Sequence, residues 1–202
     1  MSVKIRMAVL LVAVATLILG YAVNKFKQKI NISDDVEIDT SMFETKSIDE
    51  IWEIEEKENF VVEMDKYIAE KCEYGDSMET LNDKQRVLYV TQALEMEVNN
   101  GGFAQYFYNY SGDFANEAVS AFESIGAIKT AELCKKAISI YGDKVPNDRN
   151  EREKILTPDD EKEEERIEVI LNACDDAFFE YEDDLVELNY QFIINHKESF
   201  LK

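Results

Sequence analysis

Hydrophobic residues recur every three or four positions along most of the chain after residue 46. This spacing is typical of amphipathic α-helices, because 3.6 residues complete one turn and place such side chains on one face. It predicts helices that begin after Ser47 and Asn82, and further helices with apolar stripes at residues 61–72, 114–125, 129–141 and 167–193. No segment keeps the period of two that predicts a β-strand. The predicted fold class is therefore all-α.

Several helix ends are marked by capping residues and glycine. Ser47 is followed three residues later by Glu50, which is the spacing of a capping box. Residues 157–160, Thr-Pro-Asp-Asp, predict a helix start, because a capping hydroxyl precedes a first-turn proline and two acids at the positive end of the helix dipole. Gly126 is expected to close one helix. A break near residues 182–184 is expected in the last one.

An Asn-Asn-Gly-Gly sequence at residues 99–102 interrupts the apolar pattern. Asparagine and glycine tolerate the left-handed backbone that closes helices, so we expect the helix that follows Asn82 to end here. Aromatic residues then resume helical spacing, at Phe103, Tyr106, Phe107 and Tyr110. A phosphate-binding loop would need a preceding strand and a nearby Lys or Arg, and both are missing. We interpret the segment as a structural corner, made by Asn99, Gly101, Gly102 and Phe103.

The first thirty residues differ from the rest of the chain. Residues 7–23 are uncharged and almost wholly aliphatic, at the short end of the length that a membrane-spanning helix needs. We predict an uncleaved anchor with basic flanks at residues 1–30, a linker at 31–46 and an acidic helical domain at 47–202. A cleaved signal peptide is the alternative, because Gly20-Tyr21-Ala22 has the small-x-small pattern of a cleavage site. Similar numbers of bases on both sides of the segment leave its orientation open.

The charge is strongly negative and unevenly distributed. The chain has 43 acids and 22 Lys and Arg residues, for a net charge of −21. Residues 1–30 contain five bases and no acid, so residues 31–202 carry a net charge of −26. Such a body repels nucleic acid and anionic lipid and attracts basic surfaces. We therefore expect a basic protein as the partner and no direct binding of nucleic acid, with simple solubility as the alternative reading.

The densest acidic run covers residues 159–184, with thirteen acids and two bases. Helices with ordinary surface charge usually place Lys four residues from an acid, whereas here acids repeat at Asp176, Glu180 and Asp184 and repel one another. This costs helix stability and favours an interaction face, although a merely solvated face is the alternative. The candidate partner-binding residues are Asp159, Asp160, Glu163, Glu164, Asp175, Asp176, Glu180, Asp183 and Asp184.

Catalytic and metal-binding patterns are missing from the sequence. His196 is the single histidine, and Ile193 stands where a dimetal Glu-x-x-His pair would need an acid. There is no P-loop, nucleophile elbow or EF-hand loop. The three cysteines lie in apolar segments and are expected to be buried, without a CxxC site. We predict a non-enzymatic protein without a cofactor or metal; an enzyme that uses a small ligand or a metal is the less favoured alternative.

Three features occur together in residues 81–138: Glu95-x-Glu97-x-Asn99-x-Gly101-Gly102-Phe103, the aromatic helix after it, and Ala121-x-x-x-Ile125-Gly126-Ala127. In this combination the segment resembles the bacterial DNA-mimic family. The resemblance implies an acidic, all-helical domain that occupies the DNA-binding face of a basic protein, such as a transcription regulator, in place of DNA. The membrane segment departs from the family pattern. An immunity-type inhibitor of a nuclease toxin is a second hypothesis, and assembly as a homodimer stays open.

The anchor predicts that the full-length chain stays in the membrane fraction after high-salt and carbonate washing, because a spanning helix is held by its apolar surface and not by charge. Fractionation followed by immunoblotting measures this. Recovery of a mature chain that starts near Val23 in the soluble fraction would contradict the anchor and support a signal peptide.

Overall fold

The computed structural model describes residues 45–142 and 144–201, and residues 47–202 form one compact unit. All the regular elements in the described residues are helical, which confirms the all-α prediction. The α-helices are α2 (Ile48–Trp52), α3 (Lys57–Lys71), α4 (Asp83–Tyr108), α5 (Ala115–Ile125), α6 (Ile128–Ile138), α7 (Arg149–Leu156), α8 (Glu161–Phe179), α9 (Leu185–Asn195) and α10 (Lys197–Phe200). The short 3₁₀ turns are η2 (Glu73–Gly75), η3 (Met78–Thr80), η4 (Tyr110–Phe114) and η5 (Ser139–Tyr141).

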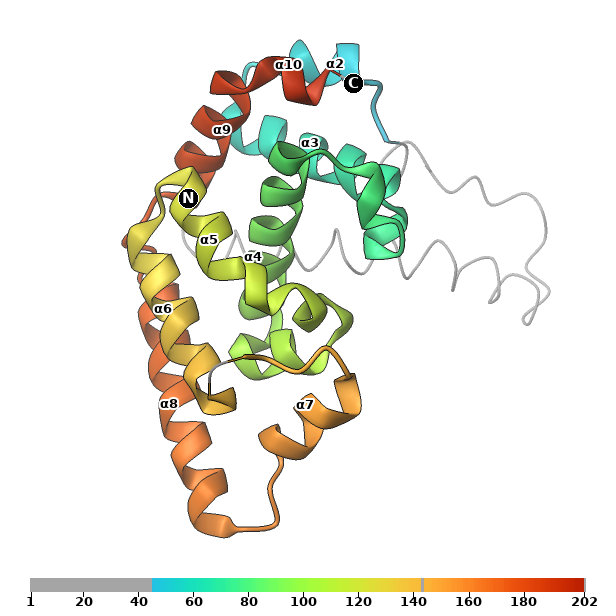
Figure 1. The fold of residues 1–202 in the computed structure, drawn as a ribbon. Coiled ribbons are helices and arrows are strands. Elements are labelled where there is room, and N and C mark those ends of the chain that lie inside the picture. Colours follow the sequence, from blue (N-terminus) through green and yellow to red (C-terminus); the bar gives the residue numbers. More distant parts are fainter. Residues whose placement is uncertain (1–44, 143, 202) are drawn as a thin grey trace, which may run out of the picture. The chain divides into compact units, whose positions relative to one another are not determined.

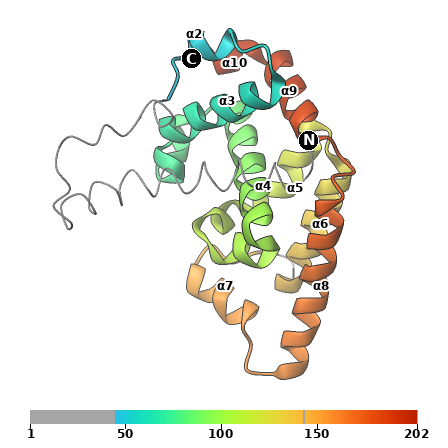
Figure 2. The ribbon, with the colours of Figure 1, turned by 180° about the vertical axis from the view of Figure 1, so that it is seen from behind.

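Helix α4 passes through the middle of this unit, and the other helices pack around it (Figure 1). Helices α6 and α8 lie side by side along one edge (Figure 1, Figure 2). Helices α2, α3, α9 and α10 gather at one end and α7 at the other. The buried side chains form a single apolar cluster that all the long helices share.

Local sequence signals account for most of the helix ends. Ser47 and Glu50 form the predicted capping box at the start of α2. Asn82 caps α4 in the same manner with Gln85. Gly126 closes α5 with a φ of +88°, in the left-handed region that glycine adopts without steric penalty. The expected break in the last acidic segment is present, because α8 ends at Phe179 and α9 begins at Leu185.

The predicted helix start at residues 157–160 is wrong by three residues. Asp160 caps α8, because its carboxylate accepts hydrogen bonds from the N–H groups of Lys162 and Glu163. The Thr157 hydroxyl instead donates to the Glu153 carbonyl at the end of α7. The hydrophobic pattern missed α7 altogether, since the buried residue of this short helix is the charged Arg152 and it has no apolar stripe.

Arg152 attaches α7 to the end of α4. Its side chain is fully buried, and its guanidinium donates to the carbonyls of Phe107 and Asn109, where α4 ends. It also forms an ion pair with Asp113 at 2.6 Å. The last carbonyls of a helix lack partners and carry partial negative charge, so a cation here satisfies both needs.

Within the described part of the chain, no helix combines the length and the apolar character needed to cross a membrane. The predicted anchor at residues 7–23 and most of the predicted linker lie outside the described residues.

Candidate interaction surface on helix α8

Helix α8 presents one apolar side to the core. It packs against α4 and α6 through four buried residues with helical spacing, Ile167, Leu171, Cys174 and Phe178. Their phase determines which acids of this helix face solvent, because residues on one α-helix repeat every 3.6 positions.

Five acids form an exposed row on the side opposite to the buried one, which we call the acidic stripe: Glu161, Glu165, Glu168, Asp176 and Glu180. None of the five side chains makes a hydrogen bond or ion pair with another described residue, so their charge is available to a partner. Neighbouring members lie three, four or eight residues apart, and the exposed Asn172 fills the longest interval. The sequence reading left Glu161, Glu165 and Glu168 out of its candidates, although the phase of Ile167 and Leu171 could have identified them.

Four of the nine predicted partner-binding acids hold helix ends within the fold. Asp160 and Asp184 cap their own helices, α8 and α9. The Asp183 carboxylate accepts from both the N–H and the hydroxyl of Thr130, at 2.7 and 3.0 Å, in the first turn of α6. The Asp175 carboxylate accepts from the Phe103 N–H at 2.7 Å. Such carboxylates are already used as hydrogen-bond acceptors.

The other five candidates lie toward solvent. Glu163 is half-buried and forms a two-bond ion pair with Arg166. Asp159, Glu164, Asp176 and Glu180 are exposed, and their side chains have no hydrogen-bond or ion-pair partner among the described residues. The structure thus brings Asp176 and Glu180 into the acidic stripe and places Asp159 and Glu164 beside its N-terminal end.

Asp175 joins α8 to an interruption in α4. The corner was expected to end one helix before a short aromatic helix, and the backbone of α4 is indeed non-helical at Gly101 and Gly102 before its second half runs on to Tyr108. Gly101 has an extended φ of −163°, whereas Gly102 has φ +78° and ψ −179°, a region that essentially glycine alone populates. The sequence reading expected a left-handed helical turn, and the actual conformation differs. The freed Phe103 N–H then points at the Asp175 carboxylate, which acts as the cap of the second half of α4.

Two further residues of the segment before the interruption contact the α8–α9 connection. The Asn99 side-chain amide donates to the Tyr181 hydroxyl at 2.6 Å, and this hydroxyl donates to Glu95 at 3.1 Å. Glu95 also accepts from the Gln92 amide. Tyr181 has a φ of +48°, which is uncommon for a residue with a side chain and fits the sharp turn between the two helices.

Asp65 of α3 lies close enough to Glu95 of α4 for their negative charges to interact, and we call these two residues the acid pair. Burial, together with the nearby Glu95 charge, raises the pKa of Asp65 to about 7. Burial also raises the pKa of Glu95 to about 7, against the lowering effect of its hydrogen bonds from Tyr181 and Gln92. Both are unusually poor acids for carboxyl groups, because burial, and to a smaller degree nearby negative charges, disfavour ionisation.

A family model for DMP19-like proteins matches residues 79–196, which is more than half of the chain. The chain belongs to the DMP19-like protein family. This is the DNA-mimic family that the Asn-Gly-Gly-Phe segment had indicated. Neither the curated proteins nor the solved structures include a match.

In this DMP19-like chain the recognisable segment serves packing. Asn99 binds Tyr181, Gly102 leaves room for Asp175, and the Phe103 ring meets Phe178 edge-on at 6.1 Å. Glu97 accepts hydrogen bonds from three side chains in or just after the second half of α4, those of Gln105, Asn109 and Ser111. The segment therefore orients α8 and braces the interruption in α4.

The three cysteines and the histidine take part in packing. Cys72, Cys134 and Cys174 are buried free thiols, as expected. His196 ends α9, with Nδ1 2.8 Å from the Phe192 carbonyl oxygen and its ring against that of Phe192. Across residues 45–142 and 144–201, no group of three or more His, Cys, Asp or Glu residues is placed to hold a metal ion.

The interruption in α4 generates a stability prediction. Gly102→Ala should lower the free energy of unfolding by about 3 kcal/mol or more, because a Cβ is strained at this φ and ψ and would collide with the Asp175 carboxylate. Gly101→Ala is the matched control, with an expected loss of about 1 kcal/mol, because the atoms nearest to its added Cβ belong to the flexible Gln105 side chain. Urea denaturation followed by circular dichroism measures both. Equal losses would contradict the role assigned to Gly102.

The acid pair generates a pH prediction. The folded-state pKa values of Asp65 and Glu95 lie above those of ordinary carboxyls, so their contribution is fully present below about pH 4 and is lost as the pH rises through about 7. Asp65→Asn should therefore raise stability at pH 8, by on the order of 1 kcal/mol or more, and flatten the loss between pH 5 and 8. Thermal melts across this range test it, with the exposed Glu79→Gln as control. An unchanged pH profile would show that the pair ionises normally.

Proposed function

We propose that residues 47–202 form a non-enzymatic interaction module that binds a basic, nucleic-acid-binding protein in place of DNA. Membership of the DMP19-like family supports this proposal. The observation that carries it is the acidic stripe, a solvent-facing row of five unpaired carboxylates along α8. A chain with ordinary solubility charges would place bases among these acids, whereas residues 159–184 contain only Lys162 and Arg166, and Arg166 is already bound to Glu163.

The spacing of the stripe suits a surface that normally binds a phosphate backbone. A helix rises 1.5 Å per residue, so acids three or four residues apart stand about 5–6 Å apart along the axis, whereas the eight-residue interval spans about 12 Å. One strand of duplex DNA carries a phosphate about every 3.4 Å, which is within a factor of about two of the shorter intervals. The exposed acids Asp159 and Glu164 beside the stripe raise its charge density further. Lys and Arg side chains are long and flexible enough to adapt to the remaining difference.

The acids of the segment have separate tasks in this proposal. Asp175, Asp183 and Asp184 hold helix ends and position α8, so we propose that they support the interface without contributing the main contacts. The acidic stripe supplies the charge. Residues 7–23 are proposed to tether the module to a membrane, which would concentrate the partner at that surface. Neither the acidic stripe nor residues 7–23 determine on which side of the membrane the module lies.

The proposal predicts that the chain displaces a DNA-binding protein from DNA. A cell extract is loaded on immobilised duplex DNA at low salt, and the full-length chain in a non-ionic detergent is used to elute it. We expect release of one or a few basic proteins. A variant with Glu165→Gln, Glu168→Gln, Asp176→Asn and Glu180→Gln should need about a tenfold higher concentration for the same release, because four exposed charges are lost while the helix caps stay intact.

A second variant controls for net charge. Glu53, Glu55, Glu79 and Glu123 are exposed acids outside α8, and their side chains have no hydrogen-bond or ion-pair partner in residues 45–142 and 144–201, so their change to Gln removes the same charge elsewhere. We expect this control variant to release the bound proteins as strongly as the unmodified chain does. Equal release by both variants, or none by the unmodified chain, would reject the stripe as the binding surface. Release of a nuclease would point to the immunity-type role.

A further inference from the structure

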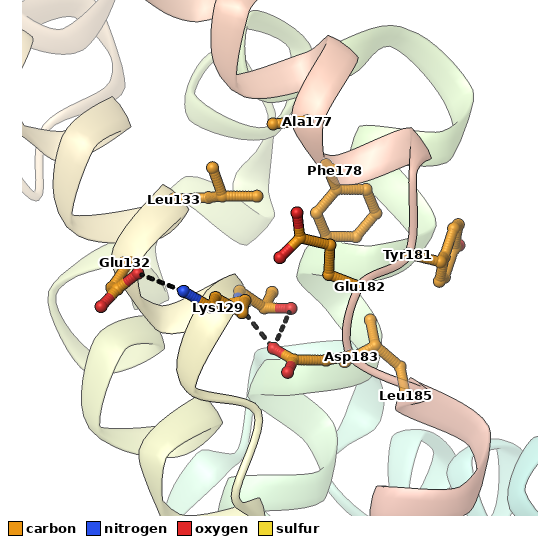
Figure 3. A pocket seen from close by; sticks show the side chains of 10 residues that line it. Lys129, Glu132, Leu133, Ala177, Phe178, Tyr181, Glu182, Asp183 and Leu185 are labelled. Atoms are coloured by element: carbon orange, nitrogen blue, oxygen red, sulfur yellow. Dashed lines mark hydrogen bonds and ion pairs between the residues drawn. The ribbon is translucent and has the colours of Figure 1, made fainter.

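A small pocket lies beside the C-terminal end of the acidic stripe, between α6 and the α8–α9 connection (Figure 3). Its volume is about 220 Å³. Small-molecule sites usually measure roughly 300–1,000 Å³, so this pocket suits a single inserted side chain better than a complete ligand. Its walls come from the first turn of α6, the last turn of α8 and the beginning of α9.

The pocket has an apolar interior and an acidic mouth. Its apolar walls are Leu133, Ala177, Phe178 and Leu185. Figure 3 shows the Glu182 carboxylate directed toward the space between Leu133 and Phe178. Glu182 is exposed, and its side chain has no hydrogen-bond or ion-pair partner among the described residues. An unpaired carboxylate above an apolar wall is complementary to a long side chain with an apolar stem and a cationic end.

The charges around the pocket also favour a cation. Lys129 and Glu132 form a long ion pair of 3.6 Å, and both side chains are more than half exposed, so this pair is weak. Asp183 is occupied by its two hydrogen bonds from Thr130. Among the acids that line the pocket, Glu182 is therefore the one left to bind a cation. Glu132 can exchange its weak ion pair with Lys129 for a stronger one with the partner's cation.

From this geometry we infer that the pocket receives an arginine side chain of the basic partner, with its stem against Leu133 and Phe178 and its guanidinium on Glu182. Arginine fits better than lysine, because its planar head pairs with carboxylates through two hydrogen bonds, stacks on aromatic rings and is more weakly hydrated. The inference rests on the proposed function and names the contact that would anchor the partner at the end of the acidic stripe. Anchors of this kind carry most of the binding energy in protein interfaces.

The test uses Nα-acetyl-arginine amide as the probe and Nα-acetyl-citrulline amide, which has the same shape without the charge, as its match. Methyl NMR signals of Leu133 and Leu185 are followed in the full-length chain in detergent micelles. We expect saturable shifts with a millimolar Kd for the arginine probe, and binding of the citrulline probe about fivefold weaker or less. Equal affinity of the two probes, or no shift of these signals, overturns the assignment.

Glu182→Gln is expected to raise the Kd of the arginine probe about fivefold, because the charge-assisted hydrogen bond is lost. Glu180→Gln is the matched control. It also removes one negative charge, two residues before Glu182, but the Glu180 side chain does not line the pocket. Its Kd should change by less than about twofold. Equal effects of the two variants would mean a general charge effect and reject the pocket.

Glu182→Gln is then used to elute the DNA column beside Glu123→Gln, which removes one exposed charge outside both the pocket and the acidic stripe, and this separates the inference from the proposed function. Weaker release by Glu182→Gln than by Glu123→Gln supports the pocket as an anchor for the partner. Release that is the same for both overturns the anchor while the proposed function stands. Arginine binding without release by any form of the chain would reject the proposed function and, with it, the anchoring role.

Discussion

The hydrogen bond from the Phe103 N–H to the Asp175 carboxylate joins the interruption in α4 to α8. The position of α8 depends on this contact. Breaking a long helix leaves several backbone groups without partners, and each unpaired group costs free energy when it is buried. In α4 the break is closed from outside. Asp175 accepts at the N-terminal end of the second half, and Arg152 donates to the carbonyls at its C-terminal end. An acid at the positive end and a base at the negative end match the helix dipole.

This arrangement explains how a run of acids can be stable. Like charges four residues apart cost a few tenths of a kcal/mol per pair on an exposed helix. Burial of one large apolar side chain contributes about 1.5–3 kcal/mol, and α8 buries Ile167, Leu171 and Phe178. The core contacts therefore outweigh the repulsion along the acidic stripe by a clear margin. A row of unpaired carboxylates can be kept on the surface without loss of the helix.

The acids of α8 and its connections divide into two groups of different physical roles. Those whose carboxylates meet free backbone N–H groups, such as Asp160, Asp175 and Asp183, hold helix ends together. Those on the opposite side are exposed and form the acidic stripe. The same residue type thus provides both the internal joints and the proposed binding surface. The pocket is lined by Glu182 and Asp183, which follow the stripe residue Glu180 closely in the sequence.

Periodicity and capping patterns determined the all-α class and most helix ends, because these depend on residues close together in the chain. The strongly acidic character followed from the composition alone. The interruption near Gly102 was also readable, although not its backbone angles. Helix α7 was not readable, since its buried residue is the charged Arg152, whose partners lie more than forty positions earlier at Phe107 and Asn109. The sequence did not identify the hydrogen-bond partner of Asp175 either. Only tertiary packing decides that one carboxylate meets a backbone amide 72 residues away while its neighbour faces solvent.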